Sequence, residues 1–91
     1  MHTVSAKLTF YIPHSNSLKD KRQICRSIID KSRQKFNASI SEIDAQDLCR
    51  TLIIGVAVVS GEMGHARQSL DEIIRFMDGF TCAELTDTEE I

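Results

Sequence analysis

The chain has 91 residues, 42% of them apolar, which is enough for one compact domain (1–91) and too few for two cores. Its net charge of −2 argues against an indiscriminate nucleic-acid binder, yet residues 1–36 hold eight Lys and Arg against two Asp (net +6), and residues 62–91 hold eight acids against two Arg (net −6). The three cysteines are widely spaced and lack a Cys-x-x-Cys pair, which argues against a disulfide framework and a zinc site.

The first two predicted elements are a strand and a helix. Apolar and polar residues alternate from Val4 to Ile12, which predicts a strand with one face in the core, and Pro13 ends it. Ser17 is placed to cap a helix over residues 18–36. Asn37 suits the left-handed residue that would close this helix.

Four further elements follow the first helix. They are a strand over 38–43, a strand over 50–59, a helix opened by 60–62 and closed at Gly79, and a strand over 82–91. The spacing of Ile40 and Ile43 breaks strict alternation and predicts a bulge or an early end to the second strand. The third strand is apolar on both faces, which is typical of a central strand.

The element order βαββαβ predicts an α+β, ferredoxin-like fold. Both helices are expected on one face of a four-stranded antiparallel sheet, with strands one and three at its centre. The other face stays open and would carry Tyr11, Ile53, Ala57 and Val59. Because these side chains are too apolar for water, we expect a homodimer through this face; a tolerated open face or another partner is the alternative.

The first helix carries the residues that could bind an anion or RNA. A basic stripe on its solvent side, its first turn and the preceding loop supply Lys19, Lys21, Arg22, Arg26, Arg33 and His14. A solvated helix face is the alternative interpretation of this stripe. Lys21 lies toward the apolar side, so it is expected to extend past the helix end or to pair with an acid such as Asp47.

No motif in the chain predicts catalysis, a cofactor or a metal site. The four glycines match neither the dinucleotide nor the Walker spacing, and the histidines lack a second ligand at a suitable distance along the chain. The N-terminus shows no signal pattern, and no apolar run is long enough to cross a bilayer. The sequence therefore predicts a soluble cytoplasmic protein with no catalytic residues, no cofactor and no membrane partner.

Several segments spread over nearly the whole chain resemble those of one known family. They are Ser17-Leu18-Lys19-Asp20-Lys21-Arg22, Phe36-Asn37 with Ser39, Glu42 and Gln46-Asp47, Gly55 to Ser60, and Ala83 to Asp87. The chain thereby resembles the YlxP-like family of small bacterial proteins of unassigned function. The resemblance implies a ferredoxin-like fold and, because the genes of this family often lie among genes for ribosome maturation and translation initiation, a role near the ribosome. The chain departs from that family at two places. It has Cys49 where family members often carry an aromatic residue, and its residues 88–91 are less apolar than the final strand of family members.

The sequence is compatible with three functions. The first is a non-enzymatic protein that binds structured RNA or a ribosomal particle through the basic stripe. The second is a homodimeric regulatory domain that binds a small anionic ligand at the start of the first helix. An enzyme of unrecognised type is the third.

Overall fold

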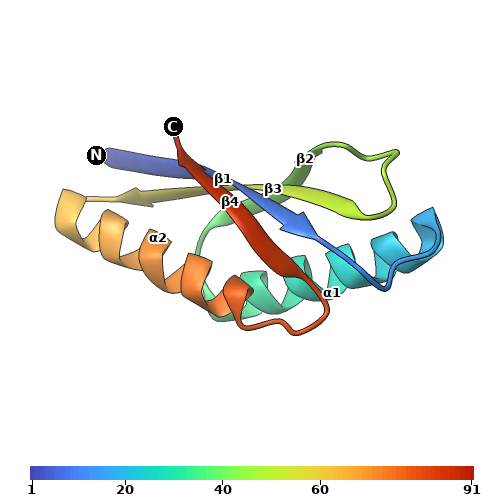
Figure 1. Ribbon diagram of the computed structural model, residues 1–91. Helices are drawn as coiled ribbons and strands as arrows, with labels where there is room; N and C mark the ends of the chain where they lie inside the picture. The colour runs from blue at the N-terminus through green and yellow to red at the C-terminus, as the bar shows by residue number, and fades with distance from the viewer.

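The computed structural model describes all residues from Met1 to Ile91 and shows six regular elements (Figure 1). These elements are β1 (His2–Tyr11), α1 (Leu18–Lys35), β2 (Ser39–Asp44), β3 (Thr51–Ser60), α2 (Met63–Asp78) and β4 (Glu84–Glu90). The four strands form one sheet in the order β2-β3-β1-β4, and every neighbouring pair is antiparallel. Figure 1 shows both helices beneath one face of this sheet. The predicted α+β, ferredoxin-like arrangement is confirmed, with β1 and β3 as the central pair.

The core lies between the sheet and the two helices. Alternate residues of β1 and β3 point into it, as the cross-strand pairs Leu8–Ile54 and Phe10–Leu52 show, and all four side chains are buried. The helices contribute their own buried residues, which are Cys25, Ile28, Ile29 and Ser32 from α1 and Ala66, Leu70, Ile73 and Met77 from α2. Because the helices cover only one face, the residues between the buried ones on each strand form an uncovered face.

Two expectations about the element ends prove wrong, and one is confirmed. Asn37 does not adopt a left-handed conformation: α1 ends at Lys35, and its C-cap Phe36 already has the extended backbone that leads toward β2. The last strand begins at Glu84 and not at residue 82, because residues 81 and 82 form a turn after α2. The irregularity predicted near Ile43 is present as a register shift between Glu42 and Asp44.

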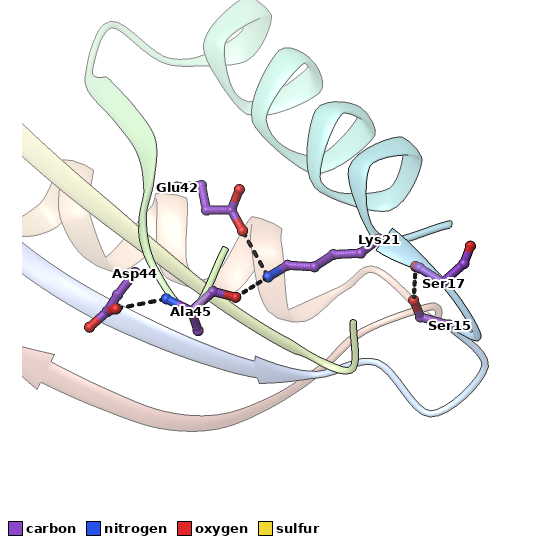
Figure 2. Close-up of polar contacts among 6 residues, drawn as sticks. All are labelled: Ser15, Ser17, Lys21, Glu42, Asp44 and Ala45. Carbon is purple, nitrogen blue, oxygen red and sulfur yellow. Dashed lines mark hydrogen bonds and ion pairs between the residues drawn. The ribbon is translucent and has the colours of Figure 1, made fainter. Parts of the chain in front are cut away.

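The turn between β2 and β3 contains the one non-glycine residue with a positive φ. Ala45 has φ 55°, and its amide donates to Asp44 Oδ1 over 2.7 Å (Figure 2). Its carbonyl accepts hydrogen bonds from the amide of Leu48 and from the Lys21 ammonium group. A left-handed conformation costs a residue with a Cβ about 1–2 kcal/mol, so these bonds must hold Ala45 in place.

We expect Ala45→Gly to raise the free energy of unfolding by up to about 1 kcal/mol, because the relief of left-handed strain exceeds the extra backbone entropy that glycine loses. Denaturant unfolding monitored by circular dichroism measures the change. Ala66→Gly, in the buried face of α2, serves as the contrast and should lower the free energy of unfolding by at least about 1 kcal/mol. A loss of stability in Ala45→Gly would contradict the proposed strain.

Candidate functional site

Lys21 is a buried residue of α1, and its contacts set the position of the helix against β2. Its side chain is 2% exposed, and its Nζ atom lies 3.0 Å from Glu42 Oε2 on β2 (Figure 2). The same ammonium group donates to the carbonyl of Ala45. The expected ion pair therefore exists, with Glu42 in place of Asp47. The prediction that Lys21 belongs to an external binding surface is wrong, because its charge is enclosed and neutralised within the molecule.

Glu42 can reach Lys21 because alternation continues through β2. Ile40 pairs with Val56 and Glu42 with Ile54, and both partners on β3 face the helices. Glu42 is therefore on the helix side of the sheet together with the buried Ile40. Apolar residues do not alternate strictly between Ile40 and Ile43, so the sequence analysis did not assign Glu42 to the helix side of the sheet. Counting by two from Ile40 would have assigned it there.

Three arginines of α1 line one groove. Arg22, Arg26 and Arg33 border a shallow depression of about 420 Å³ between α1 and β2, which is an edge strand of the sheet. Cys25 and Ile29 form part of its wall, and Ser41 and Glu42 contribute from β2. We call this depression the arginine groove. The structure therefore brings together three of the six predicted binding residues on one surface.

The charges of these arginines are not neutralised by a partner within the molecule. The structure contains three side-chain ion pairs, which join Lys7 to Glu89, Lys21 to Glu42 and Arg67 to Glu90. Arg33 donates to the carbonyl of Ile40, a neutral acceptor that leaves its positive charge in place. Asp30 also borders the groove but lies within 4.0 Å of none of its cations.

The start of α1 offers an anion fewer donors than the sequence predicted. Ser17 Oγ accepts from the Asp20 amide over 3.1 Å, and Asp20 Oδ2 accepts from the Asn16 amide over 3.0 Å. The Asp20 carboxylate thus stands where a bound phosphate would be expected. Lys19 and His14 are exposed, and neither borders the arginine groove.

Cys25 forms part of the groove wall but is not suited to nucleophilic chemistry. Burial, together with the negative charge of Glu42, raises the pKa of the Cys25 thiol to about 11. Because this pKa lies far above 7, the thiol stays protonated at neutral pH and does not form the thiolate, which is the reactive form.

No three His, Cys, Asp or Glu side chains come together as a possible metal site. Neither helix has the length and apolar character needed to cross a membrane.

The uncovered sheet face carries the four residues predicted for it. Ala57 pairs with Ser5, Ile53 with Thr9 and Val59 with Thr3, and Tyr11 lies on the same face at the end of β1. Val59 is 60% exposed and Tyr11 40% exposed. A hollow of about 340 Å³ lies between them, with Ser5, Gly55 and Ala57 among its lining residues and Ile43 and Ile91 on its flanks. The sequence analysis did not assign Ile43 to this face. Its side chain lies over Gly55, in the space that a Cβ at position 55 would need.

Comparison with known proteins agrees with the family resemblance found in the sequence. The family model described as "Protein of unknown function (DUF503)" matches residues 3–90, which is almost the complete domain. The chain belongs to the DUF503 family. It is also 36% identical over 74 residues to the uncharacterized protein YlxP of Bacillus subtilis (strain 168), and the match covers 81% of this chain and 80% of that protein. The DUF503 match spans all six elements, so the arginine groove and the open sheet face both lie within the shared domain.

We expect Lys21→Met to lower the free energy of unfolding by about 3 kcal/mol, because the change leaves the partly buried Glu42 carboxylate without its counter-charge. Chemical denaturation measures the loss. The double variant Lys21→Met/Glu42→Leu removes both charges and should recover at least half of that loss. Equal losses in the single and double variants would show that the loss comes from the missing Lys21 side chain and not from an unpaired Glu42 charge.

Proposed function

We propose that this DUF503 domain is a non-enzymatic protein that binds structured RNA through α1. The observation that carries the proposal is the arginine groove, where Arg22, Arg26 and Arg33 gather without a carboxylate partner. The guanidinium group presents several donors in a plane and matches the oxygens of a phosphate in pairs. Lys19 extends the same exposed stripe toward the start of the helix.

The distribution of acids over the sheet supports this proposal. Glu84, Asp87, Glu89 and Glu90 all belong to β4, which is the edge strand opposite β2. The arginine groove lies along the β2 edge, so the sheet separates it from the main acidic cluster. A polyanion approaching α1 would therefore meet positive charge first, although the whole chain has a net charge of −2.

A ribosomal particle is the RNA partner that we propose to test first, since the family resemblance implies a role near the ribosome. The arginine groove contains no aromatic residue on which a base could stack, so binding there should depend on phosphates and on the shape of the RNA. Such binding weakens steeply as salt rises.

We also propose that a second copy of the chain covers the open sheet face. Val59 and Tyr11 project at opposite ends of the central strand pair, and the hollow with Gly55 and Ala57 in its lining lies between them. A two-fold axis brings the same face of two copies together, so in the proposed dimer the projecting side chains of one copy would meet the hollow of the other. The dimer would leave both α1 helices free, because the sheet separates them from this interface.

The first test is retention of 30S particles or ribosomal RNA on the immobilised protein. We expect retention at about 0.1 M salt and its loss by about 0.5 M. Arg22→Glu/Arg26→Glu should abolish retention, whereas Arg67→Glu/Gln68→Glu, which adds negative charge on the exposed side of α2 away from the arginine groove and from the open sheet face, should have little effect. No retention at low salt, or equal losses in both double variants, would rule out the arginine groove as the RNA-binding site.

The second test is the mass of the protein in solution. Sedimentation velocity should show a dimer, and Ala57→Glu should give a monomer because it places a charge in the hollow of the open face. Gln68→Glu adds the same charge on the exposed side of α2 and should remain dimeric. A wild-type protein that stays monomeric at high concentration would overturn the proposed dimer.

A further inference from the structure

A second group of cations lies on the flank of α1 that faces α2. At about 100° per residue, Lys31 and Lys35 are on the opposite side of the buried stripe from the arginine groove. Figure 1 shows the end of α1 beside the end of α2, with the chain after α2 passing close to both. The two lysines therefore meet side chains that come from the last third of the sequence.

Those side chains are aromatic. The rings of Phe36 and Phe76 have centroids 5.6 Å apart at an angle of 71°, and the rings of Phe76 and Phe80 have centroids 5.5 Å apart at 87°. Lys31 Nζ lies 5.7 Å from the centroid of Phe80, and Lys35 Nζ lies 4.7 Å from that of Phe76. All three rings are partly buried, so part of each ring surface stays accessible.

Two of these rings, those of Phe76 and Phe80, border a cleft without acids. Lys31, Arg75, Phe76, Gly79 and Phe80 line a space of about 460 Å³, and none of them is a carboxylate. Neither Lys31 nor Arg75 takes part in an ion pair. Gly79 adds no side chain, which keeps the space beside Phe80 open. We call this space the aromatic cleft.

The helix dipoles explain the positions of two of the cations near this cleft, but not the position of Lys31. Lys35 and Arg75 stand in the last turns of α1 and α2, where the helix dipole favours a cation by about 0.3–1 kcal/mol at the surface. Lys31 lies farther from the helix end, and its ammonium group is placed over Phe80. The cleft thus offers an aromatic wall together with two cations whose charge no acid of the molecule neutralises.

An occupant that matches this cleft must combine a flat π-surface with negative charge. A nucleotide does so, since its base stacks on aromatic rings in a sequence-tolerant way and its phosphate pairs with Lys and Arg. An acidic peptide would satisfy the cations but would leave the ring surfaces without a flat partner. A purely apolar ligand would leave the cations without one.

We propose that the aromatic cleft binds an unpaired nucleotide of RNA, with the base against Phe76 or Phe80 and the phosphate between Lys31 and Arg75. This inference rests on the proposed RNA-binding function and deepens it by naming the class of RNA. The arginine groove and the aromatic cleft lie on two flanks of one helix, whose diameter is about 10–12 Å. A few nucleotides span that distance, so the preferred ligand is a structured RNA whose paired stem lies at the arginine groove and whose unpaired extension crosses α1.

The test uses fluorescence anisotropy with three labelled RNA hairpins. One is blunt, one carries a tail of about five unpaired adenosines, and one carries an equal tail of abasic riboses. We expect the wild-type protein to bind the adenosine-tailed hairpin about tenfold more tightly than the abasic-tailed hairpin, which keeps the phosphates but lacks the bases, and to bind the blunt hairpin most weakly. Equal affinity for the adenosine and abasic tails would overturn base stacking in the cleft.

Phe80→Leu keeps an apolar side chain but removes the ring, and it should abolish the advantage of the adenosine tail while leaving affinity for the blunt hairpin unchanged. Phe36→Leu is the matched control, because Phe36 belongs to the same aromatic cluster but does not border the cleft. Thermal unfolding verifies that both variants fold. If Phe80→Leu is unstable, Lys31→Met takes its place, because Lys31 is exposed. This variant should reduce the advantage of the adenosine-tailed hairpin over the blunt hairpin. A full advantage for the adenosine tail in a folded variant of either kind would overturn the proposal.

The arginine groove and the aromatic cleft fail in distinguishable ways. If Arg22→Glu/Arg26→Glu abolishes binding of the blunt hairpin but the adenosine tail adds nothing, the proposed function stands and the cleft assignment falls. If that double variant retains the blunt hairpin, and the tail advantage still depends on Phe80, the cleft stands and the arginine groove falls. No binding of any hairpin overturns both.

Discussion

The interface between α1 and the sheet decides which side chains of α1 remain exposed, and the ion pair between Lys21 and Glu42 is its charged contact. This ion pair joins the first turns of α1 to β2, and the same ammonium group holds the carbonyl of the strained Ala45 in the following turn. Because Lys21 must face β2, the rotation of α1 about its axis is fixed. Arg22 is then about 100° farther round the helix, at the border of the arginine groove and not in the core.

This rotation places the two proposed binding flanks of α1 on either side of one buried stripe. The flank toward β2 carries the arginines, and the flank toward α2 carries Lys31 and Lys35 beside aromatic rings. Phosphate binding and base stacking require different side chains, and the fold supplies them from different parts of the chain. The open sheet face is a third surface, which a second copy can cover without obstructing either flank.

Most of the fold could be predicted because its signals are local. Alternation along β1 and the two apolar faces of β3 predicted the central pair of strands. The wrong predictions concern the end of the first helix and the ion-pair partner of Lys21. Asn37 was expected to be left-handed, but the chain continues from Phe36 in extended form. Lys21 pairs with Glu42 and not with an acid of the turn such as Asp47, because the bulge at Ile43 makes it hard to see from the sequence that Glu42 faces the helices.

The sequence alone determined the fold class, the family, the basic character of the first helix and the apolar character of the open sheet face. The fold class and the character of the two surfaces depend on which residue types recur at a period of two or of 3.6, whereas the family follows from the resemblance of whole segments. Both kinds of signal are visible without any long-range contact. Only the tertiary structure decided which cations remain free. Burial of Lys21, the gathering of Arg22, Arg26 and Arg33 at β2, and the meeting of Lys31 with Phe80 all depend on contacts between distant segments. Charge neutralisation and stacking act over a few ångströms in space, and spacing along the chain does not measure that distance.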